Sequence, residues 1–269
     1  RHAAVVIFAA AIMNSRVIVR KVIVQIAFAC SVAIQADAAE VNVAVAANFT
    51  APIQKIAAAF TQDTGHAVVL SIGATGSLYA QIVNGAPYQM LLSADRKTPA
   101  RLEEEGLGLG GTRFIYAVGK LALWSKQPGL VDQEGEVLRT GHFEKIALAN
   151  PALAPYGAAA VETLTNLELL EQLQPKFVQG ESIAQAFQFV ATGNAPLGFV
   201  ALSQIYENGQ LTEGSAWIVP ASLHAPIEQD AVILANGKDN PAATSFAAFL
   251  QSETAIRIIC SFGYVCQQQ

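Results

Sequence analysis

Apolar and polar positions alternate along the chain in blocks that predict strands and helices in turn. The run EVNVAVAA, residues 40–47, is apolar and of strand length, and a polar turn separates it from a segment with the periodicity of an amphipathic helix, 50–65. The apolar residues at helical spacing in that segment are Ile53, Ile56, Ala57 and Phe60, and Gly65 is a typical helix end. The same order of strand, turn and helix returns at 66–86 and at 88–106.

The alternation continues to the C-terminus. Further strands are expected at 112–126 (one or two), 145–151, 176–180, 196–205, 215–220 and 226–237, and helices at 156–173, 182–194 and, as one closing helix, 241–263. This order favours parallel sheets with helices on both faces. A single sheet built from so many units would be large, so we predict an α/β protein of two lobes, each a mostly parallel sheet flanked by helices.

The N-terminal 38 residues have the order of a secretory signal: basic residues, an apolar run, and small residues at the spacing of a cleavage site. These features are Arg16, Arg20 and Lys21, the run 22–34, and Ala36 with Ala38. We therefore predict a cleavable signal within 1–38 and exclude this segment from the fold. The apolar run is short for a bilayer span. A retained membrane anchor, or a lipid anchor at Cys30, is the alternative.

Charge and cysteine content change once that segment is set aside. Of the 16 basic and 21 acidic residues, four and one lie in it, which leaves 12 and 20, a formal charge of −8. A chain this acidic, without a basic stripe, is not expected to bind nucleic acid. Cys260 and Cys266 remain as an even pair, and in an exported protein such a pair predicts a disulfide.

Four of the predicted strand-to-helix junctions are alike in their small and polar residues. Their residues are Asn48; Thr75, Gly76 and Ser77; Tyr156 and Gly157; and Glu181, Ser182 and Ile183. A helix start carries unpaired backbone N–H groups at the positive end of the helix dipole, so it favours an anion. In an open α/β sheet these turns gather at the carboxyl ends of the strands. The alternative for each junction is that its polar residues only cap the helix.

The motifs at these junctions resemble those of the periplasmic molybdate-binding proteins that supply ABC importers. The resemblance rests on VAVAANFTAPIQKIAAAF, SIGATGSLYAQIVNGAPYQMLLSAD, LANPALAPYGAAAVETL and GNAPLGFVALSQI, and it runs from about Val41 to Tyr264. It implies a two-lobed periplasmic binding protein whose chain crosses between the lobes near Ala117 and near Asp230. The lobes would comprise 39–117 with 230–269, and 118–229.

The resemblance also implies a set of ligand-binding residues. It places the ligand contacts on Asn48, with Ala47 supplying backbone, on Thr75, and on backbone donors at Tyr156 and Ile183. Some members of the family have a tyrosine hydroxyl where this chain has Ala201, and the hydroxyl of Tyr156 is then expected to replace it.

The function that the resemblance implies is delivery of molybdate or tungstate, from the periplasm, to a membrane permease and its ATPase, by a monomer that closes about a hinge. A fully deprotonated oxyanion accepts hydrogen bonds and donates none, so its site should contain donors only. Protonated phosphate should therefore be refused, whereas only cavity size would separate sulfate from molybdate. No cofactor and no metal ion bound directly by side chains are expected.

Rival functions have weaker sequence support. GLGLGG, 106–111, matches a dinucleotide motif but follows a helix and precedes a strand, so we interpret it as a linker. The histidines at 2, 66, 142 and 224 lack partners at metal-ligand spacing. We therefore predict that the chain is not an enzyme. A binding protein for sulfate or another oxyanion, and a two-lobed sensor or enzyme, are the alternatives.

Overall fold

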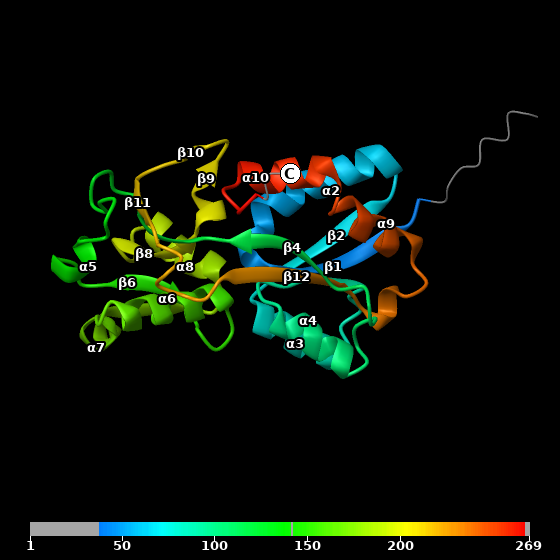
Figure 1. Cartoon of the computed structure of the whole chain (residues 1–269), viewed down its shortest axis with the longest axis horizontal. Helices are drawn as coiled ribbons and strands as arrows, with labels where there is room; N and C mark the ends of the chain where they lie inside the picture. The colour runs from blue at the N-terminus through cyan, green and yellow to red at the C-terminus, as the bar shows by residue number, and fades with distance from the viewer. Residues whose placement is uncertain (1–37, 141, 267–269) are drawn as a thin grey trace, which may run out of the picture. The chain divides into compact units, whose positions relative to one another are not determined.

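The computed structural model describes residues 38–140 and 142–266. The predicted signal segment, 1–38, lies outside the described residues except for Ala38. From Ala39 onward the described chain forms one compact unit with two main sheets (Figure 1). Within these residues, no helix combines the length and the apolar character that a bilayer span requires.

The first sheet has five strands in the order β2-β1-β3-β12-β4. Its strands are β1 (Glu40–Ala46), β2 (Ala67–Gly73), β3 (Met90–Leu92), β4 (Phe114–Gly119) and β12 (Ile227–Ile233). Its helices are α2 (Thr50–Thr64), α3 (Thr75–Val83), α4 (Lys97–Glu104), α9 (Pro241–Phe249) and α10 (Glu253–Ser261). Successive side chains of β1 face opposite sides: Val43 and Val45 pack with α2, α9 and α10, whereas Ala44 packs with α3 and α4. Both faces of this sheet are therefore covered.

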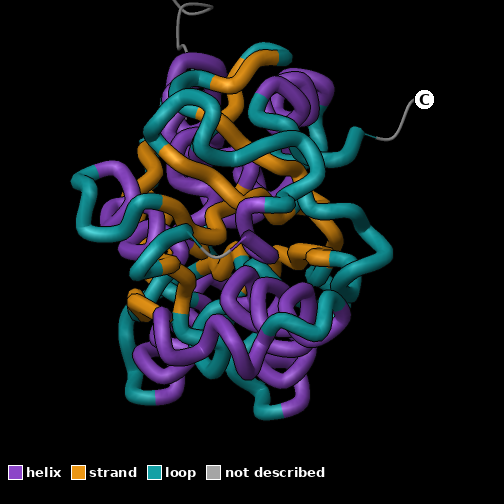
Figure 2. Tube along the Cα trace, turned by 90° about the vertical axis from the view of Figure 1, so that its left-hand side faces the viewer, coloured by secondary structure: helices purple, strands orange, loops and turns teal. Residues whose placement is uncertain are grey.

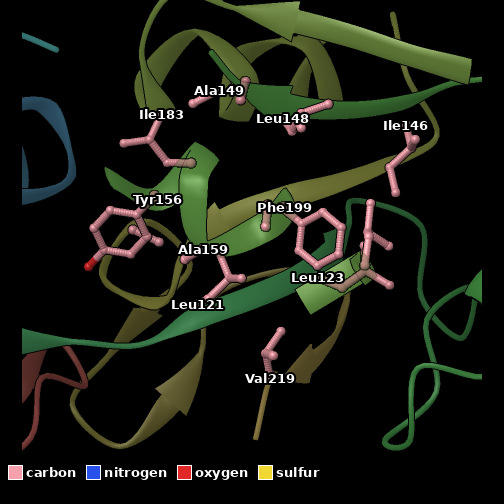
Figure 3. Packing of buried hydrophobic residues seen from close by; sticks show 14 of the residues in the cluster. Leu121, Leu123, Ile146, Leu148, Ala149, Tyr156, Ala159, Ile183, Phe199 and Val219 are labelled. Atoms are coloured by element: carbon pink, nitrogen blue, oxygen red, sulfur yellow. The ribbon is translucent and has the colours of Figure 1, made fainter. Parts of the chain in front are cut away.

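The second sheet also has five strands, in the order β11-β5-β8-β6-β7. Its strands are β5 (Leu121–Ser125), β6 (Ile146–Ala149), β7 (Phe177–Gly180), β8 (Leu197–Ala201) and β11 (Ser215–Ile218), and its helices are α5 (Val137–Thr140), α6 (Pro155–Asn166), α7 (Leu170–Leu173) and α8 (Ile183–Ala191). Figure 3 shows the core on one face, where Leu121, Leu123 and Phe199 pack with Ala159 of α6. Trp124, Ala147 and Val200 pack on the other face with Val190 of α8.

Short elements complete the described chain. They are the strands β9 (Tyr206–Glu207) and β10 (Gln210–Leu211) and the 3-10 helices Ala47–Phe49, Gln174–Lys176, Leu202–Gln204 and Ala235–Gly237. Figure 2, turned by 90° from Figure 1, shows helices above and below the strands. The prediction of an α/β fold with two helix-flanked sheets is therefore confirmed.

The sheets are mixed, although the alternation of elements predicted mostly parallel ones. The parallel pairs are β1 with β2 and β3, and β6 with β7 and β8, and the antiparallel pairs are β12 with β3 and β4, and β5 with β8 and β11. Only Lys120 separates β4 from β5, so the chain passes directly from one sheet into the other, and it returns between β11 and β12. Strands that follow one another without a crossover helix do not have to run parallel.

The predicted closing helix, 241–263, is two helices. α9 ends at Phe249, and Ser252 caps α10 by accepting a hydrogen bond on its Oγ from the backbone N–H of Ala255 at 3.3 Å. A serine cap of this kind begins a new helix because it satisfies an N–H group that the helix itself leaves unpaired. Apolar periodicity alone does not show this break.

A disulfide joins Cys260 and Cys266, as predicted. It closes a loop with a sequence separation of only 6 and so fixes the tail that carries Tyr264. Replacing both cysteines by alanine should lower the free energy of unfolding by about 2 kcal/mol, because the unfolded chain regains the loop entropy. Urea unfolding followed by circular dichroism measures this change, and reduced wild-type protein should match the variant. An unchanged midpoint would contradict the prediction.

Candidate functional site

The four junctions predicted from the sequence lie at the starts of four helical segments. In the first sheet, β1 ends at Ala46 before the 3-10 helix that contains Asn48, and β2 ends two residues before α3 begins at Thr75. In the second sheet, α6 follows β6 and places Tyr156 in its first turn, and α8 follows β7 and begins at Ile183. The first N–H groups of each helix have no acceptor within the helix, so each junction offers backbone donors.

All five predicted ligand residues line one small cavity. Its lining is Ala46, Ala47, Asn48, Gly73, Ala74, Thr75, Ala94, Ala154, Pro155, Tyr156 and Ile183. The cavity has a volume of about 10 Å³, close to what a single water molecule needs. Among the described residues that line it, none is acidic or basic. The chain therefore brings helix starts from both sheets around a small space that no charged side chain lines.

Thr75 has its hydroxyl arranged as a donor. The residue is 2% exposed, and its Oγ1 accepts a hydrogen bond from the backbone N–H of Ala94 at 3.0 Å. This contact uses one acceptor lone pair of the oxygen and leaves the hydroxyl hydrogen available for donation to a ligand. The contact also holds the end of β3 against the start of α3.

Asn48 is held by contacts to distant parts of the chain. Its Nδ2 donates to Gln229 Oε1 at 2.8 Å and to the hydroxyl of Tyr264 at 3.0 Å. Its backbone oxygen accepts from Ser203 Oγ at 2.7 Å. Since both hydrogens of the side-chain amide are engaged, the group that Asn48 can offer in this arrangement is its backbone N–H, at the start of a helical turn.

Tyr156 is buried and remains protonated. Figure 3 shows its ring beside the apolar cluster with the hydroxyl pointing away from it, and that oxygen accepts from Gln229 Nε2 at 3.1 Å. Burial raises the pKa of Tyr156 well above its usual value of about 10, since a phenolate would lose its hydration. Its hydroxyl is therefore a neutral group that can donate a hydrogen bond throughout the physiological pH range.

The family model described as bacterial extracellular solute-binding protein matches residues 41–265 of this chain. The chain belongs to this family. The molybdate-binding protein ModA of Azotobacter vinelandii is 57% identical to this solute-binding protein over 86% of this chain and 92% of its own length. ModA of Rhodobacter capsulatus is 48% identical over 90% and 94%.

A solved structure agrees with these relatives. The periplasmic molybdate-binding protein of Azotobacter vinelandii superimposes with a TM-score of 0.82 at 44% identity, covering 85% of this chain and all of that one. The resemblance inferred from the junction motifs is confirmed, and so is the two-lobed fold of periplasmic binding proteins. The relatives are binding proteins, which bears out the prediction that the chain is not an enzyme.

Ala201, the position where the resemblance led us to compare a tyrosine, ends β8 and is not among the residues that line this cavity. It is wholly buried, and its backbone N–H donates to Gln204 Oε1 at 2.9 Å. Tyr156 does line the cavity. Its hydroxyl is therefore the candidate to replace the tyrosine hydroxyl that position 201 lacks.

A larger cavity adjoins the small one. It has a volume of about 430 Å³ and shares Thr75, Ala94, Ala154 and Pro155 with it. Charged residues line this outer cavity: Asp95, Arg96, Lys97, Glu162 and Glu228. Charged side chains thus line the larger, outer cavity, where solvent and salt screen them. The small inner cavity of the solute-binding protein has no charged side chain in its lining.

Sequence reasoning missed the residues that hold the candidate ligand residues in place. Gln229, Ser203 and Tyr264 are buried and contact Asn48 or Tyr156, and of these three only Ser203, in the 3-10 helix directly after β8, lies at a strand-to-helix junction. Gln229 had a detectable signal, because it is a polar residue inside the apolar strand segment PIEQDAVIL. Ser203 also had a local signal, because it follows the apolar run of β8 at the start of a 3-10 helix. Tyr264 had none, since its role depends on contacts between segments far apart in the sequence.

Proposed function

We propose that this solute-binding protein binds molybdate, and with it tungstate, in the small cavity, through Asn48, Ala47, Thr75, Tyr156 and Ile183. The observation that carries the proposal is the chemistry of the lining: donors from four helix starts, and no charged side chain. The hydroxyl oxygens of Thr75 and Tyr156 each accept a hydrogen bond from the protein, and each hydroxyl retains a hydrogen that it can donate. The names of the close relatives support the same ligand.

A donor-only site selects a ligand by its protonation state. Molybdate and tungstate are fully deprotonated at neutral pH and accept hydrogen bonds on every oxygen. Phosphate at neutral pH carries a proton, and its O–H group would face donors without an acceptor, a buried mismatch that costs about 1–3 kcal/mol. Sulfate lacks this proton, so cavity size has to distinguish it from the larger molybdate.

Binding without a cationic side chain is energetically feasible. About six hydrogen bonds to a charged group, at roughly 1.5–3 kcal/mol each, give a gross stabilisation of about 9–18 kcal/mol. Association costs at least about 4 kcal/mol. Subtracting this minimum cost leaves about 5–14 kcal/mol, a range that includes the roughly 8 kcal/mol of micromolar affinity. The acidic net charge opposes binding only weakly, because salt screens it beyond about 8 Å.

The binding mechanism that we propose is hinge closure. One lobe, 39–117 with 230–269, would supply Asn48 and Thr75, and the other, 118–229, would supply Tyr156 and Ile183. The closed form gains contacts to the anion from both lobes, which the open form lacks, so the ligand shifts the population toward closure. The monomer would then present this closed form, in the periplasm, to the permease and ATPase of an ABC importer.

A thermal-shift panel on protein 39–269 tests the ligand. Because only ligands that bind the native state raise the melting temperature, molybdate and tungstate should raise it at micromolar concentration, and phosphate should not. Titration calorimetry then gives the affinities of the ligands that respond, with chloride as the control anion. A shift with sulfate alone would assign the protein to the sulfate alternative, and no shift with any oxyanion would refute the proposal.

A further inference from the structure

Gln229 lies outside the cavity but at the centre of the contacts around it. It is wholly buried on β12, one of the two strands through which the chain connects its sheets, and a bulge in the pairing of β12 with β4 falls between Gln229 and Asp230. A buried amide on such a strand requires hydrogen-bond partners. Its partners are residues that belong to, or adjoin, the candidate site.

The amide of Gln229 joins two of the proposed ligand residues from opposite sheets. Its Oε1 accepts from Asn48 Nδ2 at 2.8 Å and from the hydroxyl of Tyr116 at 3.0 Å. Its Nε2 donates to the hydroxyl oxygen of Tyr156 at 3.1 Å. Asn48 follows β1 in the first sheet, whereas Tyr156 lies in α6 beside the second. One side chain therefore fixes a residue from each side of the cavity.

The direction of these hydrogen bonds determines what Tyr156 can offer. Because Gln229 Oε1 faces the amide donor of Asn48, its Nε2 faces Tyr156, and the phenol oxygen accepts. A phenol that accepts in this way keeps its own hydrogen for another acceptor, and the hydroxyl of Tyr264, also hydrogen-bonded to Tyr156, is the acceptor with which a ligand would compete. A carboxylate in place of the amide would instead attract that hydrogen, and the phenol would present lone pairs to a ligand.

Gly119 leaves the space that this contact needs. It ends β4, and a Cβ at this position would overlap the hydroxyl oxygen of Tyr156 and lie 2.6 Å from Gln229 Nε2. Any side chain larger than hydrogen would therefore separate Tyr156 from Gln229. Position 119 thus requires glycine because the side chains of Tyr156 and Gln229 approach its backbone closely.

We propose that Gln229 is a positioning residue that directs the Tyr156 hydroxyl as a hydrogen-bond donor toward a fully deprotonated oxyanion. Gln229 does not touch the ligand and acts through Tyr156. The inference rests on the proposed function and deepens it, because it names the residue that keeps the site free of acceptors. The selection of fully deprotonated over protonated oxyanions therefore depends on Gln229.

A double-mutant cycle tests this role. Gln229→Met keeps the length of the side chain without its hydrogen bonds, and Tyr156→Phe removes the hydroxyl. Each single variant should raise the Kd for molybdate about 10-fold in calorimetry, and the double variant should bind no more than about 3-fold weaker than either, because both changes remove one donor. A 100-fold loss in the double variant, as for independent effects, would overturn the inference.

Two further variants separate positioning from a structural role. Gln229→Glu should weaken molybdate binding at least about 10-fold more than Gln229→Met does, and it should raise the affinity for phosphate relative to that for molybdate. Gln172→Glu, at an exposed position, is the control for added charge. Equal losses for both ligands would contradict the proposed role.

Gly119→Ala, which leaves the Gln229 side chain unchanged, should reproduce the loss seen in Gln229→Met. Gly110→Ala, with nothing within 4 Å of the new Cβ, is its control. Melting temperatures of the ligand-free variants establish that each is folded. Wild-type protein that binds no molybdate would refute the proposed function and this inference with it, whereas wild-type binding with an additive cycle would refute the inference alone.

Discussion

Thr75→Asp is expected to abolish molybdate binding, with Kd raised at least about 10³-fold. The new carboxylate would lie in the neutral inner cavity, where Thr75 is 2% exposed. Two unit charges about 4 Å apart repel by about 4 kcal/mol at an effective dielectric constant of 20, and a dianion doubles this value. About 4 kcal/mol alone corresponds to a factor of about 10³. Isothermal titration calorimetry at fixed salt measures the loss.

The fold should tolerate this substitution. Thr75 begins α3, where a carboxylate interacts favourably with the helix dipole and can still accept from the backbone N–H of Ala94. The melting temperature of the ligand-free variant should therefore stay close to that of wild type. Thr75→Ser, which keeps the hydroxyl, should bind within a few-fold of wild type. Unchanged affinity in Thr75→Asp would show that the ligand binds elsewhere.

The residues that line the cavity could be predicted because their signal is local. Asn48, Thr75, Tyr156 and Ile183 each lie in the first turn of a helical segment that follows a strand. The order of apolar run, small polar turn and amphipathic helix is visible in about twenty residues. The parallel pairs among these strands then place their carboxyl ends together at one edge of each sheet. Local pattern and sheet geometry together locate such a site.

The residues that orient these groups could not be predicted, because their contacts are long-range. Asn48 reaches Gln229 across 181 positions and Tyr264 across 216. No periodicity relates residues so far apart, and which polar atoms meet depends on how the two sheets pack. The antiparallel pairing of β12 was missed for the same reason, since the direction of a strand depends on the route by which the chain returns.

A different kind of long-range contact joins the two sheets at Gly76. Its backbone N–H, in the first turn of α3, donates to the backbone oxygen of Leu153 at 2.9 Å, in the turn between β6 and α6. A Cβ on Gly76 would lie 3.2 Å from the Cα of Leu153. This helix start thus donates an N–H group that has no acceptor within the helix to Leu153 beside the second sheet, and a residue larger than glycine would require Leu153 to shift.

Gly76→Leu should raise the Kd for molybdate by about 10- to 100-fold. A leucine side chain would fill the space in which α3 and Leu153 meet, and overpacking of this kind costs about 1–3 kcal/mol. In the hinge mechanism that we propose, this contact forms only on closure, so the cost would fall on the closed form and the apparent Kd would rise as the fraction of molecules competent to bind decreases. Calorimetry measures the affinity, and small-angle scattering with saturating molybdate should show a larger radius of gyration than wild type has.

Ala80→Leu, at an exposed position of the same helix, is the matched control and should change neither quantity. Leucine is a better helix former than glycine, so the ligand-free Gly76→Leu protein should be at least as stable as wild type in thermal unfolding. Loss of affinity without loss of stability is what distinguishes a contact made on closure from one that supports the fold. Wild-type affinity in Gly76→Leu would mean that the two halves bind the anion without approaching each other at this point, and the hinge mechanism would then lose its main structural support.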